Sequence, residues 1–216
     1  MPTVVDKSHP ARVTYMTESA LLRRSGSADL KTLESLELRG SDRAGRILRL
    51  EGLCSLRALR TLDVASNALT TLAPLAQLTT LTALDASGNQ LSSLDGLRAL
   101  SGSLRDLDLT ANAIGRLPSW LGEMRRLEWI GLAHNRLAEL RETGECLRPL
   151  PQLARLALAG NPLAALPQAR LVVVHCCRGL QQLDNAPVGI DEVRDASVRF
   201  EATRADELAT ELGTLR

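Results

Sequence analysis

Leucine and other aliphatic residues recur along this chain in a fixed frame that ends on an asparagine. The frame is L-x-x-L-x-(L/V/A)-x-x-N, with isoleucine at the fourth position in one copy. It opens the segments 59–80, 81–103, 104–126, 127–135 and 153–161, and a degenerate copy, LESLELRGS, occupies 33–41. The closing asparagines, Asn67, Asn89, Asn112, Asn135 and Asn161, lie 22 to 26 residues apart. A nine-residue pattern that returns at one period indicates an array of six stacked repeats.

The frame predicts a short strand followed by a return segment. Its L-x-L core places two apolar side chains on one face of a strand. One strand cannot bury that face alone, so successive copies should stack as a parallel sheet that neighbouring repeats stabilise. The closing asparagine can donate its amide to backbone carbonyls that the turn exposes. Leucines then follow at every third residue, as at positions 69, 72, 75 and 78, which suits 3₁₀ turns on the convex side. In the 104–126 copy, Pro118 predicts a short helical turn there.

Two repeats are irregular. The first carries about four extra residues between Ser41 and Ile47, which leaves its strand-closing position ambiguous. An insertion, RETGECLRPLPQ, occupies 141–152. We expect it to bulge from the convex side or from an edge of the array. It is either a tolerated surface loop or a binding element, and the pattern does not decide between them.

The ends of a repeat array must be covered, and both ends here carry candidate caps. We expect a disordered tail over 1–16 and a capping helix within 17–29. In that helix Thr17 is the N-cap of 18–24, and Leu21 and Leu22 face the first repeat. The six repeats fill 30–166, and a cap over 167–188 holds a helix at 170–177 and a last rung at 180–184.

A polar helix should follow over 189–216. Its apolar residues recur at three-, four- and seven-residue steps: Val198, Ala205, Leu208, Leu212 and Leu215. The stripe is amphipathic. Two interpretations remain open, a helix that folds back on the array or frays, and a helix that is offered to a partner.

Composition supports stacked aliphatic layers and excludes several partners. Of the 216 residues, 44% are hydrophobic but only 2% are aromatic, and the net charge is +1. That balance gives no global attraction to nucleic acid or to a membrane surface. The four cysteines, Cys54, Cys146, Cys176 and Cys177, form no C-x-x-C pair, which favours a reducing compartment. The N-terminal residues lack the apolar run of a signal peptide, and 171–174 is too short to span a bilayer. We expect a cytoplasmic protein, with the nucleus as the second location.

The repeat form L-x-x-L-x-x-L-D-x-x-x-N-x-L-x-x-L-x-x-L resembles the intracellular leucine-rich-repeat proteins. These include the protein phosphatase 1 regulatory subunit, the spliceosomal A-prime proteins and axonemal dynein light chain 1. Their shared terminal cap is matched by Asn161, Pro162, Leu163, Arg170, Val174, Leu180, Leu183 and Asp184, and by an E-R-x-x-A-like close over 192–196. The resemblance implies an α/β leucine-rich-repeat solenoid. In that fold a curved parallel sheet lines the concave face, 3₁₀ or helical turns form the convex face, and helical caps close the ends. It also implies a non-catalytic binding subunit. The acidic tail of the leucine-rich acidic nuclear phosphoproteins is missing, which argues against that branch.

The third, fifth, seventh and eighth positions of each frame should face the concave side. The fifth position carries Glu37, Asp63, Asp85 and Asp108 before it changes to Gly131 and Ala157. Neighbouring strands lie about 4.8 Å apart, so four carboxylates should form a ladder, which Asp106 at the third position thickens. Arg39, Arg60 and Arg105 lie near enough to offset part of this charge. The ladder is either a binding surface or a by-product of a repeat class in which aspartate is common at this position.

A tryptophan follows the acidic stretch. Trp129 stands at the third position of the fifth repeat, beside His134 and next to Arg155 in the following repeat. A solvent-facing tryptophan is a good interface anchor. Trp120 lies in a convex segment and is expected in the core.

Catalytic chemistry has no candidate. The histidines are His9, His134 and His175, no Ser-His-Asp or Cys-His arrangement stands out, and no phosphate-binding glycine loop occurs. His175, Cys176 and Cys177 are adjacent rather than ligand-spaced, so we expect no metal and no cofactor. An acidic inner face with few aromatics disfavours direct nucleic-acid contact.

We therefore expect a non-enzymatic adaptor that acts without a small-molecule substrate or a membrane. It should be a monomer within a larger complex and should dock a protein with a basic segment on its concave face. The resemblance to axonemal dynein light chain 1 suggests a cilium or axoneme. The alternatives are a regulatory subunit of an enzyme such as a phosphatase, and a ribonucleoprotein subunit that holds an RNA-recognition domain.

Overall fold

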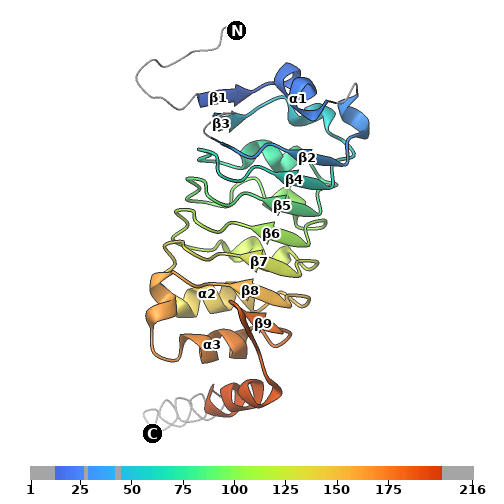
Figure 1. The fold of residues 1–216 in the computed structure, drawn as a ribbon. Helices are drawn as coiled ribbons and strands as arrows, with labels where there is room; N and C mark the ends of the chain where they lie inside the picture. The colour runs from blue at the N-terminus through green and yellow to red at the C-terminus, as the bar shows by residue number, and fades with distance from the viewer. Residues whose placement is uncertain (1–12, 27–28, 42–44, 201–216) are drawn as a thin grey trace, which may run out of the picture.

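Short parallel strands, one from each repeat, stack side by side into one long sheet (Figure 1). The computed structural model of the chain describes residues 13–26, 29–41 and 45–200. The strands of the sheet are β2 (Ser35–Glu37), β4 (Thr61–Asp63), β5 (Ala83–Asp85), β6 (Asp106–Asp108), β7 (Trp129–Gly131), β8 (Arg155–Ala157), β9 (Gln182–Leu183) and β10 (Ala186–Pro187). Their order is β10-β9-β8-β7-β6-β5-β4-β2, and only β10 is antiparallel to its neighbour. The predicted leucine-rich-repeat fold is confirmed.

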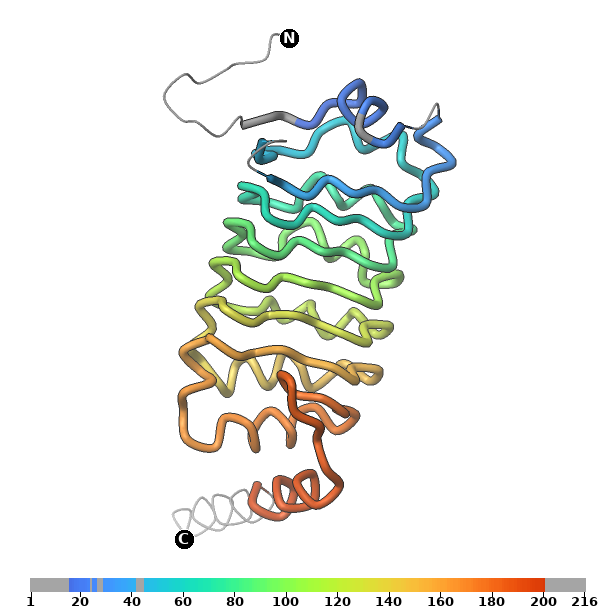
Figure 2. The backbone as a smooth tube through the Cα atoms, viewed as in Figure 1, coloured from blue at the N-terminus to red at the C-terminus, as the bar shows by residue number. Residues whose placement is uncertain are grey.

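The return segments form the convex side. They contain the 3₁₀ turns η1 (Leu30–Thr32), η2 (Leu53–Ser55), η3 (Ala73–Gln77), η4 (Arg98–Leu100), η5 (Ser119–Glu123) and η6 (Pro162–Ala165). The leucines spaced by three residues put one buried side chain into each turn, such as Leu75 in η3 and Leu121 in η5. Pro118 lies immediately before η5, as its position predicted. Figure 2 shows the result as a backbone that winds in successive similar loops.

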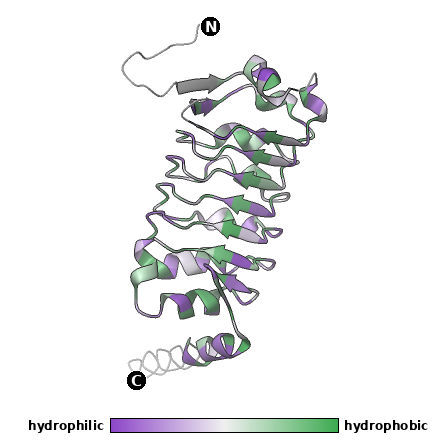
Figure 3. Cartoon of the chain, viewed as in Figure 1, coloured by the Kyte–Doolittle hydropathy of each residue, from purple (hydrophilic) through white to green (hydrophobic). Residues whose placement is uncertain are grey.

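The core runs the length of the array as layers of aliphatic side chains. Leu62, Leu84, Leu107, Ile130 and Leu156, the middle residues of successive strands, are at most 2% exposed. Each buried leucine stabilises the fold by about 1.5–3 kcal/mol relative to an exposed one. Figure 3 shows hydrophobic segments repeating in the strands and in the convex turns from one end of the array to the other.

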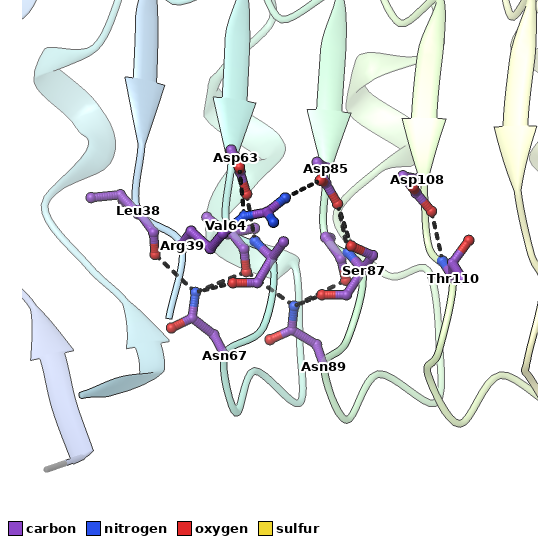
Figure 4. A network of polar contacts seen from close by, with 12 residues as sticks. Leu38, Arg39, Asp63, Val64, Asn67, Asp85, Ser87, Asn89, Asp108 and Thr110 are labelled. Carbon is purple, nitrogen blue, oxygen red and sulfur yellow. Dashed lines mark hydrogen bonds and ion pairs between the residues drawn. The ribbon is translucent and has the colours of Figure 1, made fainter. Parts of the chain in front are cut away.

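Buried asparagines join the rungs to one another. The Asn89 amide nitrogen donates to the carbonyls of Val64 and Ala86, at 3.1 and 2.9 Å, and its Oδ1 accepts from the Leu69 amide at 3.0 Å. Asn67 is bonded in the same way (Figure 4), and Asn112, Asn135 and Asn161 repeat the arrangement. Each side chain therefore satisfies backbone groups of neighbouring repeats, as the frame predicted.

The N-terminal end differs from the expected disordered tail over 1–16. Residues 13–16 form β1 (Val13–Met16), which pairs in parallel with β3 (Arg46–Leu50) as a separate two-stranded sheet. The remainder of that tail, 1–12, lies outside the described residues. The extra residues of the first repeat thus lead into β3, after a bridge between Ser41 and Gly45.

The expected capping helix is α1 (Glu18–Ser25), whose N-cap Thr17 accepts a hydrogen bond from the Ala20 amide. Leu21 is buried in the core, as expected, whereas Leu22 is exposed. The prediction that both leucines face the first repeat is therefore wrong for Leu22. Consecutive helical positions point about 100° apart, and in α1 the core-facing stripe includes Leu21 but not Leu22.

Residues 141–147 of the insertion are helical, and 148–152 form a turn. The helix is α2 (Leu140–Leu147), which packs on the convex side against α3 (Ala169–Cys176), the helix of the C-terminal cap. Thr143, Gly144 and Leu147 are buried along one helical face. A Cβ at residue 144 would lie 2.8 Å from the Cys176 Sγ, so glycine permits the close approach of the two helices. The insertion is thus a structural part of the cap.

The polar C-terminal segment is helical over 190–200 and folds back on the cap. The Arg170 guanidinium of α3 binds both carboxylate oxygens of Glu192 and also reaches the Pro187 carbonyl at 3.0 Å. Ala196 is fully buried, while Val198 is exposed. The remaining residues of the expected stripe, from Ala205 onward, lie outside the described residues. Among the helices that the structure describes, none has the length and apolar character needed to cross a membrane.

The cysteines should differ sharply in reactivity. Cys54 is exposed, whereas Cys177 is buried in the cap, and burial raises the pKa of the Cys177 thiol to about 12. A raised thiol pKa leaves less of the nucleophilic thiolate, about one part in ten thousand at pH 8. We expect N-ethylmaleimide to label Cys54 rapidly in the native protein and Cys177 only after unfolding in urea, as measured by peptide mass spectrometry over time. Native labelling of Cys177 at the rate of Cys54 would contradict the buried cap.

Candidate functional site

The first and third residues of each rung line the concave face. In β4, β5, β6 and β8 the middle residue is buried, while its two neighbours are half-buried or exposed. The parallel register aligns equivalent residues across the sheet, so that Asp63 lies beside Asp85 and Asp85 beside Asp108. Asp106, Trp129 and Arg155 follow one another in the same way in the third-position row. The structure therefore brings the predicted site residues together on one face.

The aspartates of the ladder have a structural role. Oδ1 of Asp63, Asp85 and Asp108 accepts a hydrogen bond from the backbone amide two residues further on, at 2.8, 3.0 and 2.8 Å. Such a bond closes the turn that follows each strand. This bond gives the repeat a structural reason for an aspartate at this position, whether or not a partner protein binds there.

Much of the ladder is also neutralised. The Arg39 guanidinium lies 3.2 Å from Asp63 and 3.2 Å from Asp85 and bridges the two carboxylates (Figure 4). These carboxylates raise the pKa of Arg39, with Asp63 the larger cause. The expectation that Arg60 and Arg105 offset the charge of the ladder is wrong. Arg60 pairs with Glu34 and Arg105 with Glu128, in the neighbouring row. Among the described residues, the acids of this row that pair with no arginine or lysine are Glu37, Asp108 and Asp184, of which Asp184 accepts the Leu158 and Ala159 amides.

Removing a ladder aspartate should therefore cost stability. We expect Asp85→Ala to lower the free energy of unfolding by about 1–2 kcal/mol, because the Ser87 amide, the Ser87 hydroxyl and Arg39 lose their acceptor. The matched control is Glu37→Ala, an exposed residue at the same frame position, with an expected change within about 0.5 kcal/mol. Urea unfolding measures both. Equal losses in the two variants would show that the carboxylates do not close the turns.

Trp129 is half-buried beneath an ion pair rather than freely exposed. The Arg155 Nη2 lies 3.2 Å from Asp106 Oδ1, although β7 separates their strands. The Arg155 Cζ is 5.9 Å from the centroid of the Trp129 ring, within cation–π range. Arg155 thus reaches across the indole to Asp106, and the three side chains form one contact. We call this contact, together with Asp108 and Gly131, the Trp129 patch.

Two glycines let aromatic rings lie against the sheet. A Cβ at residue 131 would lie 3.1 Å from Trp129 Cη2, and one at residue 160 would lie 2.4 Å from His134 Nδ1. The exposed His134 imidazole therefore rests over Gly160 of the next repeat. By frame position alone, Gly131 only ends the acidic row, and no role is predicted for Gly160. A glycine inside a strand frame signals close approach of other groups, and that signal could have located both positions.

The patch holds binding chemistry rather than reactive chemistry. It offers two carboxylates, an indole face and a cation, which are groups that recognise another surface. Within the ranges that the structure describes, no three His, Cys, Asp or Glu side chains are grouped to hold a metal ion.

The sequence matches the family described as "Leucine-rich repeat" over residues 74–213. A search of curated proteins finds no significant match. Among solved structures, an internalin from Listeria monocytogenes is 18% identical with a TM-score of 0.62, over 82% of this chain and 58% of its own. A chain of the Drosophila melanogaster SNF/U2A′ complex is 24% identical with a TM-score of 0.54, over 82% of this chain and 87% of its own. An LRR protein of Leptospira interrogans is 25% identical with a TM-score of 0.55, over 68% of this chain and 36% of its own. The chain thus spans little more than half of the internalin and about a third of the Leptospira protein.

Proposed function

Because the chain belongs to the leucine-rich-repeat family, we propose that it is a non-catalytic module that docks a partner protein on its concave face. One observation carries this proposal. The sheet presents a half-buried tryptophan beside small residues and an arginine–aspartate ion pair. Tryptophan and arginine are the residue types that contribute most to protein interfaces.

The geometry of the Trp129 patch suits a docking site. Trp129 stands on β7, while Ala157, at the end of β8, and Ala159, just after it, leave a low floor in the next repeat; Gly131 is itself covered by neighbouring side chains. A low floor beside a large ring gives a partner side chain a place to insert. The indole already loses part of its exposure to Arg155, so less area must be desolvated when a partner covers it.

The biological setting is a further part of the proposal. The resemblance to axonemal dynein light chain 1 favours an assembly subunit of a cilium or axoneme in the cytoplasm, monomeric within its complex. A ribonucleoprotein role is the second candidate, because the similar U2A′ chain is in a complex with SNF. Regulation of an enzyme such as a phosphatase is the third, and rests on the phosphatase-regulator form of the repeat. Residues 17–40, together with the LDVASNALTTLAPLAQL segment at 62–78, resemble leucine-rich repeat-containing protein 61, and we propose a relationship to it on that basis.

Site-specific photo-crosslinking tests the proposal. A benzoylphenylalanine replaces Ala157 on the concave face, or Gln77 on η3 of the convex face as the matched control. In cells that express the full chain, we expect the concave probe to form a discrete adduct with one protein and the convex probe to form none with it. Mass spectrometry of the adduct then distinguishes axonemal proteins, splicing factors and phosphatases. Equal adducts from both faces, or adducts from the convex probe alone, would rule out concave docking.

A further inference from the structure

Asp108 stands apart from the other aspartates of the concave face. Asp63 and Asp85 share Arg39, and Asp106 pairs with Arg155. Asp108 uses Oδ1 to accept the Thr110 amide at 2.8 Å, and among the described residues no cation pairs with its carboxylate. It is half-buried, and on its far side the row continues with Gly131 and Ala157 instead of another acid. The structure therefore leaves the half-buried Asp108 carboxylate without a paired cation beside Gly131.

Three different groups converge above Gly131. A Cβ there would lie 2.6 Å from Asp108 Oδ1, 3.0 Å from Thr110 Oγ1 and 3.1 Å from Trp129 Cη2. A carboxylate, a hydroxyl and the end of an indole ring thus cover Gly131 and lie close to one another there. Carboxylate and hydroxyl oxygens accept hydrogen bonds, and an indole attracts cations through its π-system. The combination suits a positively charged group with several donors.

The molecule already contains one such contact. Arg155 places its guanidinium against the Trp129 ring and pairs with Asp106 at the same time. Asp106 and Asp108 lie two residues apart on the same face of β6, and both adjoin β7. Trp129 therefore lies between one carboxylate that has its arginine and one that lacks it. An external arginine at Asp108 would reproduce the contact that Arg155 makes with Asp106.

We propose that Asp108 and Trp129 form a receptor for one arginine side chain of the partner. The guanidinium pairs with the Asp108 carboxylate and lies against the part of the indole nearest Gly131. Arginine fits better than lysine, because a planar guanidinium both forks onto a carboxylate and stacks on a ring, whereas an ammonium is a compact, strongly hydrated charge. This inference rests on the proposed function and adds the chemistry of the partner's contact residue.

The test titrates the full-length ¹⁵N-labelled chain with the peptide acetyl-Gly-Gly-Arg-Gly-Gly-amide and follows the two indole N–H signals by NMR. We expect a saturable shift for Trp129 and none for Trp120, which lies on the convex side and serves as the internal reference. The same peptide with citrulline, a neutral isostere of arginine, should bind at least five-fold more weakly. The lysine peptide should bind at least two-fold more weakly. Binding of the citrulline peptide as tight as that of the arginine peptide would overturn the proposal without any variant.

A pair of charge-matched variants localises the site. Asp108→Asn keeps an oxygen that can accept the Thr110 amide, so the turn survives, and we expect the arginine peptide to bind at least five-fold more weakly. Glu37→Gln removes the same charge three strands away on the same face and should change affinity by less than two-fold. Equal losses of peptide affinity in both variants would mean that the peptide responds only to the overall negative charge of the concave face. The proposed arginine receptor would then be wrong. If the crosslink from position 157 persists while Asp108→Asn leaves arginine binding intact, the receptor fails and the docking function stands. Loss of the concave crosslink itself would instead reject the function.

Discussion

Replacing Asn89 with alanine should lower the free energy of unfolding by about 3 kcal/mol, and the loss should be seen in urea titration as a lower midpoint. The Asn89 side chain bonds to backbone groups of its own repeat and of the preceding one, including the Leu69 amide and the Val64 carbonyl. Alanine leaves the buried Leu69 amide without an acceptor, which costs about 1–3 kcal/mol. The Val64 and Ala86 carbonyls keep Asn67 and Asn112 as donors but each lose one hydrogen bond, at about 0.5–1.5 kcal/mol apiece. Water entering the gap offsets part of that sum, which is why we expect the lower part of the range.

The matched control for this prediction is Asn185→Ala. Asn185 is an exposed asparagine in the turn between β9 and β10 and lies outside the repeat frame. We expect its replacement to change stability by less than about 0.5 kcal/mol. Because stability in a repeat array comes from the interfaces between neighbouring repeats, Asn89→Ala should lower the unfolding midpoint of the whole array. A loss below about 1 kcal/mol at Asn89 would mean that the asparagines do not hold the rungs together.

Replacing Trp129 with alanine should weaken binding of the crosslinked partner by about 30-fold. The expected change corresponds to about 2 kcal/mol, which is typical of a tryptophan anchor at an interface. The variant removes the ring that carries Arg155 and leaves the Asp106–Arg155 ion pair with no surface beneath it. Isothermal titration calorimetry with the purified partner measures the effect, and thermal unfolding shows that the variant remains folded.

Trp120 provides the control within the same chain. It is half-buried on η5 of the convex side and packs against the core, so Trp120→Ala should lower the melting temperature while leaving the dissociation constant unchanged within two-fold. If both tryptophan variants weaken binding to the same extent, the effect comes from lost stability and the assignment of Trp129 is wrong.

The repeat frame predicted most of the fold because its contacts are local and recurrent. Each L-x-L segment became a strand, most return segments contain a 3₁₀ turn, and each closing asparagine became a bridge between rungs. β1 was missed, since VTYM lacks the frame and forms a strand only through its partner β3, some 30 residues later in the chain. α2 was missed because Thr143 and Gly144 occupy buried helical positions where an apolar residue would have indicated a helix.

The sequence predicted which face of the sheet carries the site residues, but not which of their side chains contact one another. Frame position alone put Asp63, Asp108 and Trp129 on the concave side. The pairs depend on how far long side chains reach: Arg39 reaches across two further rungs, and Arg155 reaches back over a whole strand. Those reaches convert an apparent acidic ladder into one in which Asp63 and Asp85 share an arginine while Glu37 and Asp108 have no paired cation. The sequence of a single repeat does not show which side chains pair across neighbouring strands.

The most direct test of concave docking is hydroxyl-radical footprinting of the full chain with and without the crosslinked partner. Trp129 and His134 on the concave face and Trp120 on the convex side are all readily oxidised, so one experiment reports both faces. We predict that the partner slows oxidation of Trp129 and His134 several-fold and leaves Trp120 unchanged. Protection of Trp120 with no change at Trp129 would contradict the account, because the partner would then lie on the convex side.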